Sequence, residues 1–273
     1  MRQYFDRFWH QTLRRPYRLV CTIDQGDGMP VLLLHGLGTS SKVWEPVVRR
    51  LMGVSCRLVV CDLLGFGVSP KPTWSQYSTE DHAQAVIRTL EYKHVKGPII
   101  IVGHSMGCLI AVHIARLRPA LVKQLILYEM PLYAGLPEKR RYKVRRDLYF
   151  ALYNRIVRHP EFSPTNIRAI QKLTARAVGF TISKETWVPF VRSLKNTIMQ
   201  QTTLQDLKRI QVPTEAIYGS FDMVVIRGNP RQIFGEAAHV HTQVVTAGHS
   251  ISAKASSTIA GHVVSLVTGK VHA

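Results

Sequence analysis

The sequence predicts an α/β fold with a mostly parallel, doubly wound sheet and a helical insertion. Short apolar runs of strand length alternate with segments of helical periodicity over most of the chain. Strands separated by helices are typical of βαβ units, which place a parallel sheet between two layers of helices. From about residue 132 to residue 201 this alternation stops, and only helical spacing is found. We therefore expect a sheet domain that is interrupted by a helical cap.

Short apolar runs mark the strands expected in the first half of the chain. Residues 31–34 are apolar throughout, as in parallel strands covered on both faces, and residues 98–102 have the strongest strand character in the chain. Residues 17–23 alternate between apolar and polar side chains and lead into a turn-like segment at 24–28. The strands expected here are residues 17–23, 31–34, 57–60, 98–102 and 122–128.

Helices are expected between these strands. Residues 41–52 carry apolar side chains at helical spacing, and Ser78 or Thr79 can cap the start of a helix that runs to Tyr92. The helices expected in the first half are residues 41–52, 79–92 and 106–118. Beyond the insertion, we expect strands at 214–218 and 239–246 and helices near 230–236 and from about 253 to 267.

The predicted organisation has an N-terminal helix, a core and a cap. Residues 1–16 form an amphipathic helix, because large apolar side chains recur in them at helical spacing before Pro16 ends the segment. We expect the apolar side of this helix to pack on the core, and burial in a membrane interface is the alternative. Residues 17–131 and 202–273 form the α/β core, and residues 132–201 form the cap.

Composition restricts the function classes. Apolar residues make up 46% of the 273 residues, so the chain can bury a large core. No apolar run approaches the roughly 18–20 residues that cross a bilayer, and arginines interrupt the first fifteen residues where a secretory signal would be apolar. The net charge of +19 can reflect attraction to nucleic acid, to an anionic membrane surface or to an acidic substrate, or a general bias of composition without a specific partner. Nucleic acid is not expected, because no nucleic-acid-binding motif is present.

The four cysteines carry no motif. Cys21, Cys56, Cys61 and Cys108 form no CxxC pair and have no histidine or cysteine at zinc-finger spacing. We interpret them as free thiols in a reducing compartment. Together with the absence of a signal sequence, this predicts a cytoplasmic location, with peripheral membrane contact as an addition that stays open.

The motif around Ser105 predicts a nucleophile. The segment Gly103-His104-Ser105-Met106-Gly107 matches G-x-S-x-G, and it follows an expected strand and opens an expected helix. A serine on such a sharp strand-to-helix turn is exposed on a strained backbone, and the flanking glycines leave room for the close approach of neighbouring backbone. The helix N-terminus beside it favours the developing oxyanion.

A serine nucleophile needs a histidine base that a carboxylate holds. Asp222 and His249 each follow an expected strand of the second half, in the chain order serine, acid, histidine. Loops at the carboxyl ends of parallel strands share one edge of the sheet, where ligands bind. We predict Ser105, Asp222 and His249 as the catalytic residues, with Glu129, at the end of another strand, as the rival acid.

Two backbone N–H groups are needed to bind the oxyanion. One is expected from Met106, directly after the nucleophile. The other is expected from Leu37, in the loop that follows the strand at 31–34. In both residues the backbone rather than the side chain acts.

No metal site is predicted. His239 and His241 lie two residues apart in an expected strand and would share a face, but no acidic or cysteine partner accompanies them. We interpret them as surface histidines.

The sequence resembles the α/β-hydrolase superfamily. The resemblance extends from about Leu19 to the C-terminus and keeps the order of the family's motifs. The matching parts are His35-Gly36-Leu37-Gly38, Asp62-Leu63-Leu64-Gly65-Phe66-Gly67-Val68-Ser69, the elbow at Ser105, Gly219 to Asp222, and Gly248-His249. The resemblance implies a carboxylic ester hydrolase without a cofactor, a structural D-x-x-G-x-G-x-S loop that lines the pocket, and a cap domain at 132–201.

Departures from the family's patterns restrict the chemistry. Serine rather than aspartate at position 105 argues against epoxide hydrolases and haloalkane dehalogenases. Ser250 stands after the histidine where the C–C hydrolases of meta-cleavage typically have tryptophan, which argues against that class without excluding it.

The expected substrate is a small-molecule ester or acyl compound. Aromatic side chains are frequent in the cap, and those that face the pocket favour an apolar acyl or aromatic ester. The cap also carries six basic residues between positions 139 and 146, which we interpret as a solvated face. The alternatives are a thioesterase or acyltransferase, a peripheral lysophospholipase whose basic surface meets anionic lipid, and a non-catalytic binding module.

Overall fold

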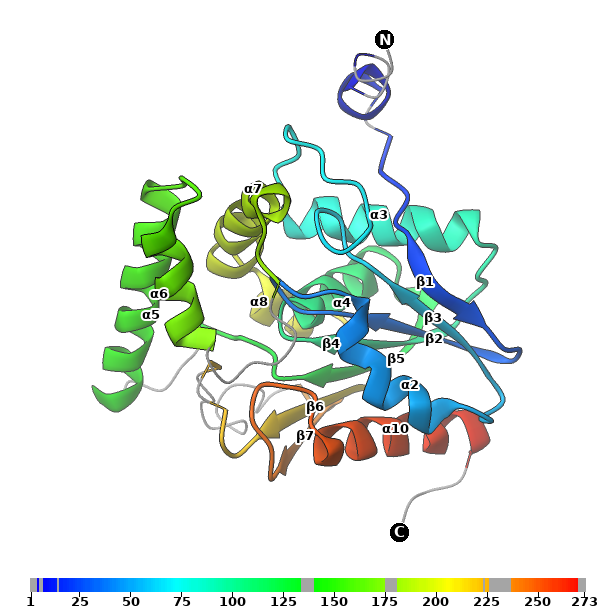
Figure 1. Ribbon diagram of the computed structural model, residues 1–273. Coiled ribbons are helices and arrows are strands. Elements are labelled where there is room, and N and C mark those ends of the chain that lie inside the picture. The colour runs from blue at the N-terminus through cyan, green and yellow to red at the C-terminus, as the bar shows by residue number, and fades with distance from the viewer. Residues whose placement is uncertain are drawn as a thin grey trace.

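The computed structural model describes residues 4, 7–13, 15–133, 140–174, 181–222, 224–225 and 237–269. Its centre is a seven-stranded sheet with the order β1-β3-β2-β4-β5-β6-β7 (Figure 1). Strand β1 runs antiparallel to β3, and all other neighbours are parallel. The strands are β1 Cys21–Gln25, β2 Met29–Leu34, β3 Cys56–Cys61, β4 Ile99–His104, β5 Val122–Tyr128, β6 Thr214–Gly219 and β7 Val240–Val245. The predicted fold class is confirmed.

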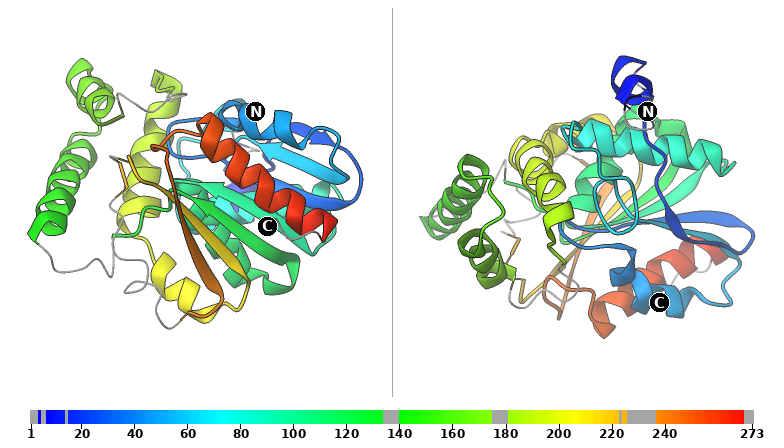
Figure 2. Two further views of the ribbon diagram at one scale, coloured as in Figure 1. Left: turned by 90° about the horizontal axis from the view of Figure 1, so that it is seen from below. Right: turned by 45° about the horizontal axis from the view of Figure 1, so that its top comes forward.

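Helices cover both faces of the sheet (Figures 1 and 2). Alternate side chains of one strand enter different cores: Leu32 and Leu34 pack with α3 and α4, whereas Val31 and Leu33 pack with α2 and α10. Strands covered on both faces must be apolar throughout, which explains why β2 and β4 read as continuous apolar runs. The helices of the core are α2 Glu45–Leu51, α3 Thr79–Tyr92, α4 Met106–Leu117, α8 Thr203–Arg209 and α10 Ala253–Thr268, with 3₁₀ turns at Ser41–Trp44 and Pro119–Leu121.

The inserted segment contains helices and packs on the core. Helices α5 and α6 stand side by side at one end of the molecule, and α7 lies between them and the sheet (Figures 1 and 2). The Thr197 hydroxyl donates to the Tyr77 carbonyl over 2.9 Å, and the Thr181 N–H donates to the Gly38 carbonyl over 2.7 Å. The elements are α5 Arg140–Arg158, α6 Pro164–Thr174, α7 Lys184–Ser193 and a π-helical segment Leu194–Met199. The domain boundaries at 132 and 201 stay a prediction.

Most predicted elements agree with the structure, and the differences have local causes. The bounds of α3 and β5 match the prediction, and Ser78 caps α3 through a capping box with Asp81. Strand β1 starts at Cys21 rather than Tyr17, and it continues through Asp24 and Gln25 into the expected turn, because both pair with β3. The helix expected near 230–236 lies outside the described residues.

Two expectations are wrong. Cys21 and Cys61 form a disulfide rather than two free thiols, because antiparallel pairing of β1 with β3 places them opposite each other; Cys56 and Cys108 are free and buried. In the N-terminal segment, the described side chains Phe8, Trp9 and Leu13 are 52%, 41% and 45% exposed, so they do not pack on the core as expected. The short π-helix Phe8–Thr12 of this segment stands away from the sheet layers (Figure 1).

Candidate active site

Ser105 occupies the turn between β4 and α4. Its backbone has φ +53° and ψ −118°, outside the regions that side chains other than glycine favour. Two backbone hydrogen bonds hold it there: Ser105 N donates to the Tyr128 carbonyl over 3.0 Å, and Cys108 N donates to the Ser105 carbonyl over 2.9 Å. Strain of this kind persists where the surroundings over-determine it and is common at functional sites.

The two glycines of the motif make this turn possible. A Cβ on Gly107 would lie 2.2 Å from the Leu34 carbonyl oxygen, and a Cβ on Gly103 would lie 2.7 Å from Cys108 N. The first contact brings the start of α4 against the end of β2, and the second lets the strand fold back on the helix. The predicted role of the flanking glycines is therefore confirmed.

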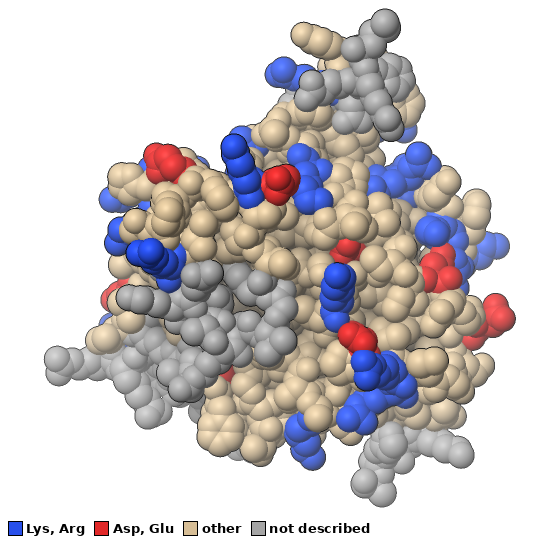
Figure 3. Space-filling model, in the orientation of Figure 1, with Lys and Arg blue, Asp and Glu red and all other residues tan. Residues whose placement is uncertain are grey.

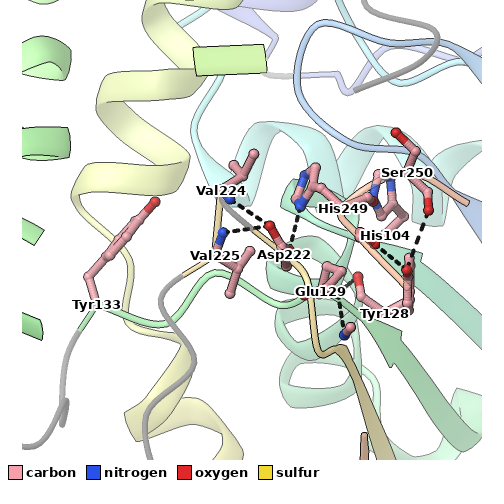
Figure 4. Close-up of polar contacts among 12 residues, drawn as sticks. His104, Tyr128, Glu129, Tyr133, Asp222, Val224, Val225, His249 and Ser250 are labelled. Atoms are coloured by element: carbon pink, nitrogen blue, oxygen red, sulfur yellow. Dashed lines mark hydrogen bonds and ion pairs between the residues drawn. The ribbon is translucent and has the colours of Figure 1, made fainter. Parts of the chain in front are cut away.

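Asp222 and His249 come together as predicted. Asp222 follows β6 and His249 follows β7, at the carboxyl ends of neighbouring parallel strands. His249 Nδ1 donates to Asp222 Oδ2 over 2.8 Å, and Asp222 Oδ1 accepts the N–H groups of Val224 and Val225 (Figure 4). This bond fixes the tautomer in which the other ring nitrogen of His249 is available to accept a proton.

Asp222 is held ionised despite its burial. Burial acts to raise the pKa of this carboxyl, but the hydrogen bond and charge of His249, a hydrogen bond from Glu129 and the Val224 N–H together hold it well below its ordinary value. A carboxylate that keeps its charge can stabilise an imidazolium beside it.

Sequence reasoning missed two residues that hold the histidine loop. His104 Nε2 donates to the His249 carbonyl over 2.8 Å, and the Tyr128 hydroxyl donates to the Gly248 carbonyl over 2.5 Å (Figure 4). Burial, together with the neighbouring His249, lowers the pKa of His104 to about 3, so this ring is neutral at pH 7. The available signals were the second position of the G-x-S-x-G motif and the last residue of β5, and neither was assigned a role from the sequence.

The two predicted oxyanion donors lie on either side of Ser105. Met106 is the first residue of α4, and Leu37 follows Gly36 in the loop after β2. A Cβ on Gly36 would lie 3.1 Å from the Ser105 Cβ, so this loop approaches the nucleophile closely. The assignment of the two N–H groups to an oxyanion stays a prediction.

A largely apolar pocket joins these groups to the cap. Ser105, His249 and Leu37 line it from the core, and the cap contributes aromatic and aliphatic side chains. The residues from the cap are Tyr149, Tyr153, Ile156, Ile170, Phe190, Leu194 and Ile198. Among the other aromatic residues of the cap, Tyr142 and Phe180 have no described side chain, whereas Phe162 is exposed and Trp187 packs within the cap.

The loop after β3 has a structural role. Asp62 Oδ1 accepts the Ser41 N–H over 2.7 Å, and Asp62 Oδ2 accepts the Val68 N–H over 2.8 Å. Gly67 has φ +49°, and a Cβ there would collide with the Asp62 carboxylate. The expectation that this loop lines the active-site pocket is wrong, because Asp62, Gly67 and Val68 line a separate groove beside it.

One group of described residues has the composition of a metal site. Ligand atoms of Glu129, Asp222 and His249 lie within 4.8 Å of one another. Hydrogen bonds within this group and to neighbouring backbone account for its arrangement. His239 precedes β7 and contacts the Leu207 carbonyl through Nε2, whereas His241 is exposed on the strand, so the two do not form a site together.

Comparison with known proteins decides the family. A sequence model of the family described as alpha/beta hydrolase fold matches residues 29–254. The chain belongs to this family. Lipase 1 of Psychrobacter immobilis is 26% identical over 213 residues, which are 72% of this chain and 63% of the lipase. The chain spans less than two thirds of the length of this lipase.

Other relatives match a shorter region or the fold alone. Probable lysophospholipase BODYGUARD 3 of Arabidopsis thaliana is 34% identical over 122 residues, 42% of this chain, and the match spans about a quarter (24%) of that protein. The enol-lactonase from Burkholderia xenovorans LB400 superimposes with a TM-score of 0.68 at 20% identity, covering 92% of this hydrolase and 96% of the lactonase.

Proposed function

We propose that this hydrolase cleaves carboxylic esters through an acyl-enzyme on Ser105. One arrangement carries the proposal: the Asp222–His249 hydrogen bond lies beside a serine on a positive-φ turn, and both Ser105 and His249 open on one apolar pocket. Such an arrangement supplies the three groups that an activated serine uses: the nucleophile, a base and a group that orients the base.

The proposed reaction has two similar halves. Ser105 Oγ attacks the ester carbonyl while His249 accepts its proton, and Asp222 stabilises the resulting imidazolium. The N–H groups of Leu37 and Met106 bind the tetrahedral oxyanion, and His249 then protonates the departing alcohol. Water, activated by His249, repeats the sequence on the acyl-enzyme and releases the acid. The mechanism requires no cofactor.

The pocket favours a neutral, apolar acyl or aromatic group. Its described lining contains no lysine, arginine, aspartate or glutamate. An anionic acyl group would therefore enter without a partner, which is costly in an apolar site. A thioester or an acyltransferase substrate with the same acyl group would place that group in the same pocket; this is the enzymatic alternative.

A second proposal concerns the membrane. Tyr4, Phe8, Trp9 and Leu13 are exposed in the N-terminal segment, and Arg7 and Arg15 are exposed beside them. Aromatic and basic side chains together favour the interface of an anionic bilayer. We propose peripheral contact through this segment. On the face drawn in Figure 3, the described Lys and Arg side chains are spread out without a single patch.

The structure bears on the membrane and the compartment in two further ways. Within the described residues, no helix combines the length and apolar character needed to cross a bilayer. The predicted cytoplasmic location depended on four free thiols and on the absence of a signal sequence, and the Cys21–Cys61 disulfide contradicts the first of these two observations. Flotation with anionic vesicles at low salt tests the membrane contact; protein that stays at the bottom of the gradient contradicts it.

Labelling with a fluorophosphonate probe tests the proposed chemistry. We expect the wild type to be labelled and the S105A variant to be unlabelled, and we expect turnover of p-nitrophenyl esters of short or medium chain length. Labelling without ester turnover would favour the thioesterase or acyltransferase alternative. A folded wild type that is not labelled would contradict the activated serine and favour the binding-module interpretation.

A further inference from the structure

A second buried carboxyl, that of Glu129, lies beside Asp222 (Figure 4). Glu129 is the first residue after β5, has φ +55° and is 1% exposed. Its carboxylate, that of Asp222 and a ring nitrogen of His249 all lie within 4.8 Å of one another. A non-glycine residue at positive φ in a buried position is held there by its surroundings, so this placement is specific.

The backbone of β6 fixes the Glu129 side chain. Glu129 Oε1 accepts the Gly219 N–H, and Glu129 N donates to the Ile217 carbonyl over 2.9 Å. A Cβ on Gly219 would lie 2.6 Å from Oε1, so glycine at this position makes room for the carboxyl. The second carboxyl oxygen is thereby directed to the neighbourhood of Asp222.

Two carboxylates this close cannot both be ionised without a large cost, because burial weakens the screening of their repulsion. Asp222 is the one that stays ionised: it accepts hydrogen bonds from His249 Nδ1 and from the N–H groups of Val224 and Val225. An oxygen that only accepts belongs to a carboxylate. If one carboxyl of the pair carries a proton, the hydrogen-bond partners of Asp222 place that proton on Glu129.

We propose that Glu129 is a neutral carboxylic acid that donates a hydrogen bond to Asp222 and so positions the Asp222–His249 pair. This inference depends on the proposed function of that pair. The hydrogen bond from Glu129 is also among the interactions that hold the pKa of Asp222 low. Glu129 is thus not the rival acid of the sequence prediction but a positioning residue behind Asp222.

Three other titratable groups lie near Glu129 among the described residues, and none of them offers it a positive charge. They are Cys108 from α4, Tyr128 from β5 and Tyr218 from β6. Burial, and to a lesser extent the proximity of the Glu129 carboxyl, raises the pKa of each of the three, so at pH 7 they are uncharged and provide no countercharge.

The E129Q and E129M variants test the proposal as a matched pair. Glutamine keeps an oxygen for the Gly219 N–H and offers an N–H to Asp222, whereas methionine keeps the length and removes both contacts. We expect E129Q to retain most of the wild-type kcat, and E129M to lose about 10- to 100-fold, the factor that corresponds to one hydrogen bond to a charged group. E129Q as inactive as E129M would overturn the proposal.

Two spectra separate positioning from mere stability. The infrared difference between wild type and E129Q is expected to contain the C=O stretch of a protonated carboxylic acid; a carboxylate band in its place would overturn the proposal. The downfield NMR proton of the His249 Nδ1–H is expected to persist in E129Q and to shift in folded E129M, and no shift would likewise overturn it. Neither spectrum depends on turnover, so an unlabelled wild type would refute the proposed function without deciding the state of Glu129.

Discussion

The edge of the sheet and the inner surface of the cap contribute to the pocket in different ways. At the sheet edge, His104, Tyr128 and Asp222 are held by hydrogen bonds to backbone atoms of neighbouring loops. The cap contributes mainly apolar side chains and tyrosine rings. The hydroxyls of Tyr133, at the start of the cap, and Tyr153 lie 3.3 Å apart. The difference indicates that the core determines which bond is cleaved and the cap determines which substrate enters.

Removing the charge of Asp222 should have the largest effect on this division. The D222N variant keeps the shape of the side chain but favours the wrong tautomer of His249, and we expect kcat to fall by about 10³- to 10⁴-fold. KM should change little, because Asp222 is absent from the pocket lining. Steady-state kinetics with one ester checks both; a kcat within a few-fold of the wild type would show that the sheet edge does not determine the chemistry as described.

A substitution in the cap should have the opposite pattern. Ile156 lines the pocket from α5 and is 1% exposed. We expect I156F to shorten the space for the acyl group and to exclude about two of its methylenes. Since each buried methylene contributes about 0.8 kcal/mol, the ratio of kcat/KM for long over short esters should fall by about 10-fold. Equal loss for all chain lengths would mean that the cap affects the chemistry rather than selection. Circular dichroism provides the control for folding.

A smaller effect is expected from the loop that carries His249. The Y128F variant removes the hydroxyl that donates to the Gly248 carbonyl, which should lower kcat by about 2- to 10-fold. The ratio between long and short esters should stay the same, because the tyrosine hydroxyl faces the loop rather than the pocket lining. A changed ratio would place Tyr128 among the residues that select the substrate.

The contact between core and cap should be visible as a pH dependence of stability. His82 Nε2 pairs with Ser193 Oγ of α7 over 3.0 Å, and burial lowers the pKa of His82 from 6.5 to about 3. Between these values the unfolded chain binds a proton that the folded chain does not, so the free energy of unfolding falls as pH falls.

The H82Q variant isolates this contribution. As pH falls well below 6.5, the free energy of unfolding of H82Q should decrease less steeply than that of the wild type. The two slopes should differ by about 1.4 kcal/mol per pH unit. Urea unfolding at a series of pH values measures the slope, and H241Q, which changes an exposed histidine, should keep the wild-type slope. Identical slopes for wild type and H82Q would contradict a neutral, buried His82.

The strand pattern and the motif order sufficed to predict the sheet and the Asp222–His249 pair. A G-x-S-x-G motif between a strand and a helix places its serine at the carboxyl end of a parallel strand. The loops after β6 and β7 start at the same edge of the sheet. The strands covered on both faces, such as β2, were recognised from their continuous apolar character.

Features that depend on tertiary pairing could not be predicted. The Cys21–Cys61 disulfide depends on the antiparallel pairing of β1 with β3. This pairing brings together two cysteines that lie 40 residues apart in sequence. The position of Glu129 depends on a positive φ and on the missing Cβ of Gly219, and neither is visible in a strand pattern. His104 and Tyr128 were assigned no role from the sequence, because their hydrogen bonds reach a loop more than 100 residues away.

Intact-protein mass spectrometry during turnover tests the central claim most directly. With a slowly deacylated ester, we expect the wild-type protein to gain the mass of the acyl group, and we expect fragmentation to place that mass on Ser105. The S105A variant should gain none and should not turn the ester over. An adduct on another residue, or turnover that persists in S105A, would contradict the acyl-enzyme mechanism.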